Sequence, residues 1–206
     1  MVSVPRQSDT RERVLDVSAQ IFRRQGYAAT ALKQIVSEGR APIGSLYHFF
    51  PGGKQQVGLE ALTRSGEGFG RLIDHVFERS SDTPAAAIAW FALAADALEQ
   101  SDYADGCPIG TVASEVASSN DALRLVCAEA FEAWMAKIRI ALIRDGVSPA
   151  DAKALAVFGL SALEGAFILS RVTRSTQPLE NSGQLVAAAI QGAIRSGQPR
   201  ASSPTA

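Results

Sequence analysis

The stretch GSLYHFFPGGKQQ, Gly44 to Gln56, places an aromatic cluster beside a Gly-Gly-Lys tripeptide. Glycine-rich loops that end in lysine often bind phosphate, because backbone N–H groups and the ammonium group both favour an anion. A nucleotide-binding loop of this kind requires a preceding strand, the spacing GxxxxGK and a Ser or Thr after the lysine. Here Gln55 follows Lys54, and the residues before Pro51 have helical spacing. The context of this segment therefore excludes a nucleotide-binding loop.

The remaining reactive side chains do not predict catalysis. Two cysteines, Cys107 and Cys127, and two histidines, His48 and His75, lack the spacing of a zinc site, so we expect no metal. No nucleophile–base pair or paired carboxylates can be identified, so we expect no catalytic residues and no cofactor. With 206 residues, 47% of them hydrophobic and 20% charged, the chain is typical of a globular protein.

The sequence predicts a cytoplasmic protein without a membrane span. Residues 1–8 are polar and lack the apolar segment of a signal peptide. The longest apolar run, residues 154–169, is interrupted by Ser161 and Glu164 and is shorter than the ~20 residues that a span requires.

Charge is distributed unevenly along the chain. Residues 1–54 hold eight Lys or Arg against four Asp or Glu, whereas residues 55–206 hold twelve against seventeen. A basic first quarter joined to an acidic remainder suggests that the first part contacts a polyanion.

Apolar residues recur at spacings of three and four almost throughout, which predicts an all-α chain of about nine helices. We expect a helix-turn-helix domain over residues 1–54, a helical ligand-binding and dimerisation domain over 55–196, and a disordered tail over 197–206. The predicted helices lie near residues 9–25, 30–38, 43–50, 54–77, 84–100, 109–118, 121–144, 149–172 and 180–195.

The first three predicted helices have the outline of a helix-turn-helix unit, since two short helices are separated by a break of four residues. One set of side chains would anchor the second and third helices on the first: Leu32, Ile35, Val36, Leu46 and Phe50. The opposite face of the third helix carries hydrogen-bonding side chains free to enter a major groove, namely Ser45, Tyr47 and His48.

Residues 10–56 resemble the DNA-binding domain of the TetR family of bacterial transcriptional regulators. The resemblance rests on Ile21-Phe22-x-x-x-Gly26-Tyr27, Thr30-x-Leu32-x-x-Ile35, the run from Gly44 to Phe50, and Lys54. The Pro51-Gly52-Gly53-Lys54 variant and Gly106-Cys107-Pro108 are similar to the LmrA/YxaF-like branch.

This resemblance implies a homodimer that binds a palindromic double-stranded DNA operator, most often as a repressor, and that a small-molecule effector releases. It places the dimer contact in the helices near 148–172 and 180–195, which are rich in small residues. The implied DNA contacts are Thr30, as the cap of the second helix, with Lys33, Gly44, Ser45, Tyr47, His48 and Lys54.

Two positions depart from the family pattern. Arg40 stands where the turn usually has glycine, and a left-handed arginine costs about 1 kcal/mol, so the turn is either strained or rearranged. Ile43 replaces a residue that is commonly polar or basic, and it can touch a thymine methyl but cannot donate to guanine.

A ligand pocket is expected between the helices of the second part. Its candidate residues are Trp90, Tyr103, Cys107, Phe131, Trp134, Glu164 and Phe167. For each aromatic residue, an ordinary place in the hydrophobic core is the competing interpretation. Glu164 lies in an apolar stretch, where a carboxylate is costly unless it is paired, so it either contacts a ligand, pairs with an Arg such as Arg171, or reaches solvent.

We therefore predict a ligand-responsive, DNA-binding transcriptional regulator in which ligand binding moves the fourth helix and changes the separation of the two recognition helices. The alternative is a helical small-molecule-binding or interaction module whose DNA binding is weak or lost. A steep dependence of DNA affinity on salt would separate the two.

Overall fold

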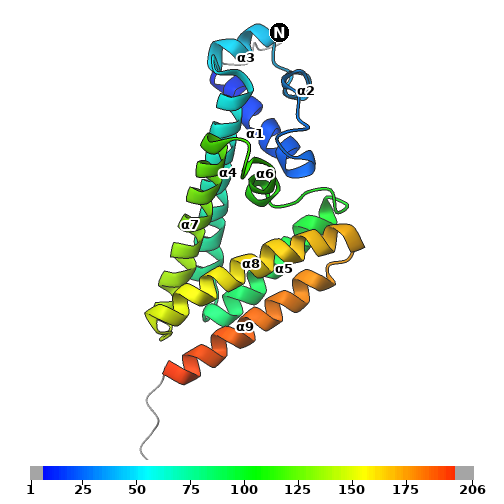
Figure 1. Ribbon diagram of the computed structural model, residues 1–206. Coiled ribbons are helices and arrows are strands. Elements are labelled where there is room, and N and C mark those ends of the chain that lie inside the picture. Colours follow the sequence, from blue (N-terminus) through cyan, green and yellow to red (C-terminus); the bar gives the residue numbers. More distant parts are fainter. Residues whose placement is uncertain (1–6, 198–206) are drawn as a thin grey trace, which may run out of the picture. The chain divides into compact units, whose positions relative to one another are not determined.

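The computed structural model describes residues 7–197, in which every regular element is a helix, and this confirms the all-α prediction (Figure 1). The predicted tail lies outside the described residues, apart from Gly197. The helices are α1 (Gln7–Gln25), α2 (Leu32–Glu38), α3 (Ile43–Phe49), α4 (Gly53–Arg79), α5 (Thr83–Gln100), α6 (Pro108–Val116), α7 (Asp121–Arg144), α8 (Pro149–Thr173) and α9 (Gln177–Gly197).

The start of α2 differs from the sequence prediction. Its N-cap is Ala31, which makes no side-chain capping bond, so the prediction that Thr30 caps this helix is wrong. Thr30 is buried, and its hydroxyl donates to the carbonyl of Gly26 at 2.6 Å. The hydroxyl therefore stabilises the turn between α1 and α2, where it bonds a backbone carbonyl instead of a helix N–H group.

The described chain forms two compact units. The first extends through Gly70 and includes Ser101–Glu132, so it contains α1–α3, the first part of α4, α6 and the first part of α7. The second comprises Arg71–Gln100 and the chain from Ala133 onward. These units differ from the functional segments expected from the sequence, whose boundary at residue 54 stays a prediction.

In the first unit, α1 packs against α2, α3 and α6. The side chains that anchor these helices are fully or almost fully buried: Val14, Phe22, Ile35, Leu46, Phe50, Ile109 and Val112. Their spacing follows from the helical period, since Leu46 and Phe50 are four residues apart and lie on one side of α3 and its end. The anchoring of α2 and α3 by Ile35, Leu46 and Phe50 agrees with the prediction.

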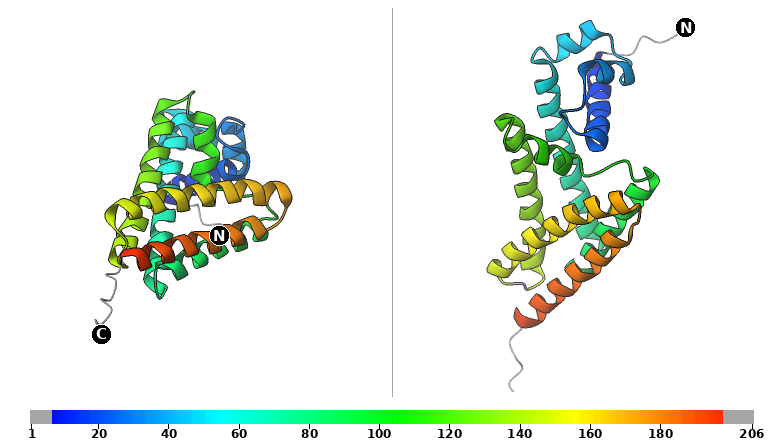
Figure 2. Two further views of the ribbon diagram at one scale, coloured as in Figure 1. Left: turned by 60° about the horizontal axis from the view of Figure 1, so that its bottom comes forward. Right: turned by 45° about the vertical axis from the view of Figure 1, so that its right-hand side comes forward.

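In the second unit, α9 packs along both α5 and α8. Figures 1 and 2 show α8 and α9 side by side, joined by a short connection, with α5 next to them. The approach of α9 to α5 requires Gly183, because a Cβ atom there would lie 2.7 Å from the Cβ atom of Phe91. The start of α5 is tied to the end of α7, since the carboxylate of Asp145 accepts the backbone N–H of Thr83 at 2.7 Å and also its hydroxyl.

Helix α8 has an unusually apolar surface. Among the described helices it alone is long and apolar enough to cross a membrane, with a mean hydropathy of 1.6 over its best window and 33% of that window buried. Its large apolar side chains that face solvent, together with one from α9, are Val157, Phe158, Ile168, Leu169, Val172 and Leu185. An exposed apolar surface of this kind is typical of a contact with another protein or with a membrane.

The turn between α2 and α3 holds its arginine in the left-handed conformation. Gly39 ends α2 in a right-handed conformation, and Arg40 follows with φ +47°. The N–H of Ala41 donates to the carbonyl of Val36 at 3.0 Å, and Arg13 of α1 donates to the carbonyl of Gly39 at 2.8 Å. Of the two alternatives left open by the sequence, the structure therefore has the strained turn, and the exposed Arg40 carries the strain.

Replacing Arg40 by glycine is expected to stabilise the protein by up to about 1 kcal/mol, because glycine adopts this backbone conformation without a steric cost. Thermal unfolding at a fixed protein concentration measures the effect. Ser37→Gly, three residues earlier inside α2, is the matched control and is expected to destabilise by about 0.5–1 kcal/mol. A loss of stability in both variants would contradict the strain at Arg40.

Candidate nucleic-acid interface and ligand cavity

Helix α3 has two chemically different faces. Leu46 is fully buried, whereas Tyr47 is 52% exposed and Ile43 is 51% exposed. His48 is also exposed, and its ring lies 5.1 Å from that of Phe49 in an edge-on arrangement. A short helix fixed on one side by apolar packing, with a phenol and an imidazole free on the other, can present these groups to the edges of DNA bases.

The other predicted DNA contacts near the turn fall into two groups. Gly44 is exposed, and apart from the neighbouring backbone of α3 no atom lies within 4 Å of the position that a Cβ would take there. Ser45 is half-buried, and Lys33 is exposed on α2. Thr30 differs from these because it is buried, with its hydroxyl bonded to the protein backbone. An exposed lysine on α2 and an open start of α3 are features that can approach a phosphate backbone.

In the Gly-Gly-Lys segment, the backbone N–H groups of both glycines form hydrogen bonds within the protein. The Gly52 N–H donates to the side chain of Gln56 at 2.9 Å, and the Gly53 N–H donates to the carbonyl of Phe50 at 2.8 Å. Gly53 has φ +59°, a conformation that favours glycine. The segment thus closes the turn between α3 and α4. A helix precedes it, whereas a nucleotide-binding loop follows a strand.

Lys54 makes its contacts within the first unit. Its ammonium group donates to the carbonyl of Ala28 at 3.3 Å and lies 4.3 Å from the ring centre of Tyr27. Burial lowers the pKa of Lys54, and this is partly opposed by the negative charge of Glu115. With these partners, Lys54 helps to hold the turn before α2 in place. The sequence motif did not reveal this role.

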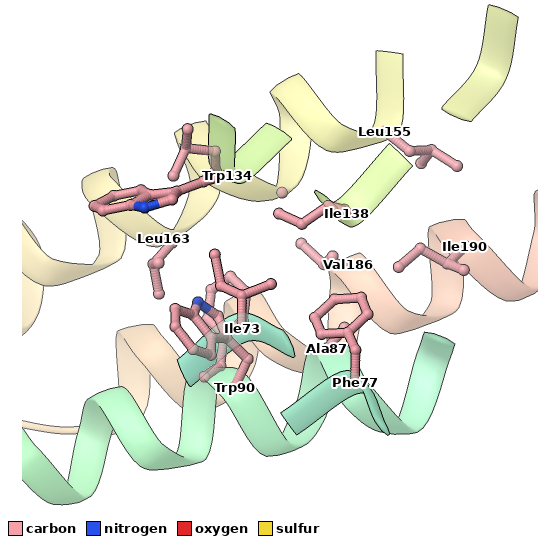
Figure 3. A pocket seen from close by; sticks show the side chains of 13 residues that line it. Ile73, Phe77, Ala87, Trp90, Trp134, Ile138, Leu155, Leu163, Val186 and Ile190 are labelled. Carbon is pink, nitrogen blue, oxygen red and sulfur yellow. The ribbon is translucent and has the colours of Figure 1, made fainter. Parts of the chain in front are cut away.

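An apolar cavity lies within the second unit (Figure 3). Its empty volume is about 510 Å³, including the part that is open to solvent. Among the lining residues, only the two indole N–H groups of Trp90 and Trp134 can form side-chain hydrogen bonds, and no lining residue is charged. The lining comes from five helices: Ile73, Phe77, Ala87, Trp90, Phe91, Trp134, Ile138, Leu155, Gly159, Leu160, Leu163, Val186 and Ile190.

The structure brings together only part of the predicted ligand-binding set. Trp90 and Trp134 line the cavity, whereas Glu164 and Phe167 belong to the same unit but do not line it. Tyr103, Cys107 and Phe131 lie in the first unit. Cys107 is buried as the N-cap of α6, where its sulfur accepts the N–H of Gly110 at 3.3 Å.

Most of the cavity lining is aliphatic, whereas the residues predicted from the sequence were mainly aromatic. The missed residues often come in pairs four positions apart on one helix, such as Ile73 with Phe77 and Val186 with Ile190. This spacing is visible in the sequence, but it marks every buried helix face, so it does not separate a cavity wall from a packed core.

A helix-turn-helix with a free polar recognition face, joined to a helical body that contains an apolar cavity, defines a DNA-binding transcriptional regulator. Residues 14–61 match the family described as bacterial regulatory proteins, tetR family, and residues 84–185 match the C-terminal domain of LmrA/YxaF-like transcriptional regulators. The chain belongs to the TetR family, with a C-terminal domain of the LmrA/YxaF-like kind.

Two curated relatives come from Bacillus subtilis (strain 168). The uncharacterized HTH-type transcriptional regulator YxaF is 37% identical over 171 residues, which are 83% of this chain and 90% of that protein. The HTH-type transcriptional regulator LmrA is 32% identical over 171 residues, 83% of this chain and 91% of that one. Regulators of this family bind DNA, are typically ligand-responsive dimers, and are generally cytoplasmic.

Solved structures share the fold. A TetR transcriptional regulator from Chloroflexus aurantiacus J-10-FL is 27% identical, with a TM-score of 0.77 over 90% of this chain and 96% of that chain. A TetR transcriptional regulator from Legionella pneumophila has a TM-score of 0.79 at 20% identity, over 91% of this chain and 98% of that chain.

Proposed function

We propose that this regulator is a cytoplasmic repressor without catalytic activity, which binds a palindromic operator as a homodimer and leaves it when an apolar ligand fills the cavity of the second unit. The observation that carries the DNA-binding part is the exposed polar face of α3 opposite the buried Leu46. Tyr47 and His48 read base edges in this proposal, and Lys33 contacts phosphate.

The lining of the cavity supports a particular class of effector. A pocket without charged groups offers no compensation for the desolvation of an ionised ligand, so the effector is an uncharged and largely apolar molecule. The indoles of Trp90 and Trp134 add aromatic surface, which favours a ligand that contains a ring.

The exposed apolar side chains of α8 and α9 support the dimer. Phe158 and Leu169 of α8 and Leu185 of α9 face solvent in the single chain. Cβ atoms built at Gly165 and Gly192 would meet no atom within 4 Å apart from the neighbouring backbone of their own helix, so these two helices leave room for close approach by another copy. We propose that this face is the contact between the two protomers.

Helix α4 supports a route for release. It begins at Gly53, directly after the helix-turn-helix, and carries the cavity-lining residues Ile73 and Phe77 towards its other end. A ligand that displaces these side chains acts on a continuous helix. Release requires that the ligand prefer the DNA-free form, and a change from 99:1 to 1:99 requires a preference of about 10⁴-fold.

The first test is a selection of genomic DNA fragments with the purified protein, followed by footprinting of the most enriched fragment. A short protected palindrome is the expected result, because two recognition helices of a dimer reach half-sites about 34 Å apart. The absence of any enriched fragment at low salt would refute the DNA-binding proposal and favour the interaction-module alternative.

Replacing Lys33 by alanine is expected to weaken binding to the selected fragment and to reduce the slope of log K against log salt by about 1, since one phosphate contact is lost. Fluorescence anisotropy over a range of salt concentrations measures both quantities. Arg139→Ala, which removes an exposed cation from α7, is the control and is expected to leave the slope unchanged. An unchanged slope for Lys33→Ala would remove Lys33 from the interface.

A further inference from the structure

Glu115 of α6 holds the backbone just before α2. One oxygen of its carboxylate, Oε2, accepts the N–H of Tyr27 at 2.8 Å and the N–H of Ala28 at 2.9 Å. Both bonds involve an ionised acceptor, which makes them stronger than hydrogen bonds between neutral groups. Gly26 has φ +80°, a conformation that favours glycine, and the carboxylate of Glu115 occupies the space that a Cβ atom there would take. We call residues 26–28 the Tyr27 turn.

The Tyr27 turn is also fixed by its other neighbours. Lys54 of α4 donates to the carbonyl of Ala28 and lies over the ring of Tyr27. The same ring lies 5.6 Å from that of Phe22, and a Cβ atom at Gly58 would come within 2.8 Å of it. The carbonyl of Gly26 in this turn accepts the hydroxyl of Thr30, which lies two residues before the start of α2. This turn therefore contributes, together with the packing of Ile35, to the position at which α2 begins.

Helix α6, which carries Glu115, is held in place by buried side chains and by hydrogen bonds to the end of α1. Its residues Ile109, Val112 and Val116 are buried in the first unit. The connection before it is bound to the end of α1, because the N–H of Gly106 donates to the carbonyl of Arg23 at 3.1 Å and the guanidinium of Arg24 donates to the carboxylate of Asp105 at 2.7 Å. The connection leads back to α5, which carries the cavity residues Ala87, Trp90 and Phe91.

We propose that Glu115 is a positioning residue for operator binding. By holding the N–H groups of Tyr27 and Ala28, it fixes α2, and with it α3, in the arrangement that fits DNA. Any displacement of α6 then loosens this arrangement, which gives the effector a second route besides α4. The inference rests on the proposed DNA-binding function, because the helix-turn-helix must bind an operator for its position to matter.

The direction in which DNA affinity changes when Glu115 is replaced separates a positioning role from a purely electrostatic one. Glu115 is an acidic residue in a unit that is proposed to bind a polyanion. If its charge acted only at long range, removal of the charge would tighten DNA binding, because repulsion of phosphate would fall. If Glu115 positions α2, removal of the carboxylate weakens DNA binding, and the slope of log K against log salt does not change, since no phosphate contact is lost.

The experiment compares the full-length wild type with Glu115→Ala, Glu115→Gln and the control Glu129→Ala, which removes an exposed carboxylate from α7 of the same unit. The probe is the DNA fragment recovered by the selection. We expect Glu115→Ala to weaken its binding about tenfold or more with an unchanged salt slope. Glu115→Gln, which keeps an acceptor oxygen, should have a smaller effect, and Glu129→Ala should not weaken binding.

Hydrogen exchange of the free proteins provides a readout that does not depend on DNA. The amides of Tyr27 and Ala28 are expected to exchange at least about tenfold faster in Glu115→Ala than in the wild type. Equal or tighter DNA binding by Glu115→Ala would overturn the proposal. If that variant does not unfold cooperatively, equal or tighter binding by Glu115→Gln decides against it.

The two proposals can fail separately. If the wild type enriches no fragment, the proposed function fails. Hydrogen exchange still tests the contact in that case, because unchanged exchange of the Tyr27 and Ala28 amides in Glu115→Ala would show that Glu115 does not hold them. If the wild type binds its fragment and the Glu115 variants bind it equally well, the regulator stands and the positioning role of Glu115 is refuted.

Discussion

Replacing Phe158 by glutamate is expected to separate the dimer into monomers and to weaken operator binding by about 100-fold or more. Phe158 is 47% exposed on α8, within the apolar face proposed as the protomer contact. A carboxylate at this position would be buried without a partner in both copies, which disfavours association. A monomer reaches one half-site at a time and loses the gain from linked binding, which is of the order of 10²–10⁴.

Analytical ultracentrifugation measures the association, and anisotropy with the selected fragment measures the affinity. The matched control is Leu125→Glu, because Leu125 is 46% exposed and lies on α7, outside the proposed contact. This control is expected to remain a dimer with the operator affinity of the wild type. A Phe158→Glu protein that remains dimeric would place the protomer contact elsewhere on the molecule.

Replacing Trp134 by alanine is expected to lower the free energy of unfolding by about 3–5 kcal/mol, as for other buried large aromatic residues. Trp134 is 1% exposed and lines the cavity, so its removal enlarges an existing void. For a chain of this size the melting temperature should fall by about 10 °C at a fixed protein concentration. Trp134→Phe, which keeps one aromatic ring, should lose less than half as much.

The same variant tests the chemistry of the cavity with an uncharged apolar dye, N-phenyl-1-naphthylamine. Binding to the folded protein raises the melting temperature by mass action, and the larger void in Trp134→Ala should give the larger rise. A dye that stabilises neither protein would argue against an effector site for uncharged apolar molecules. A loss of less than 1 kcal/mol in Trp134→Ala would show that the indole is not packed as described.

The helix-turn-helix could be predicted from the sequence because its determinants are local. The spacing of Leu46 and Phe50 indicated the buried side of α3, and it left Tyr47 on the opposite face. The roles of Thr30 and Lys54 could not be found in this way. Thr30 donates to Gly26 and Lys54 donates to Ala28, so both depend on the path of the turn before α2.

The cavity was predictable in kind but only partly in composition. Trp90 and Trp134 were correctly grouped, because large aromatic residues at helical spacing point to a helical interior. Tyr103 and Phe131 were grouped with them by residue type, although they belong to the other unit. The division of α7 between the two units depends on tertiary contacts, and no single stretch of sequence carries that information.

The nearly uniform apolar lining of the cavity has a consequence for the ligand specificity of the proposed effector response. A pocket that recognises a guest mainly by its fit discriminates poorly between related compounds, since one methylene changes the affinity by only about 1–3 kcal/mol. Such a sensor would respond to the combined concentration of several similar molecules.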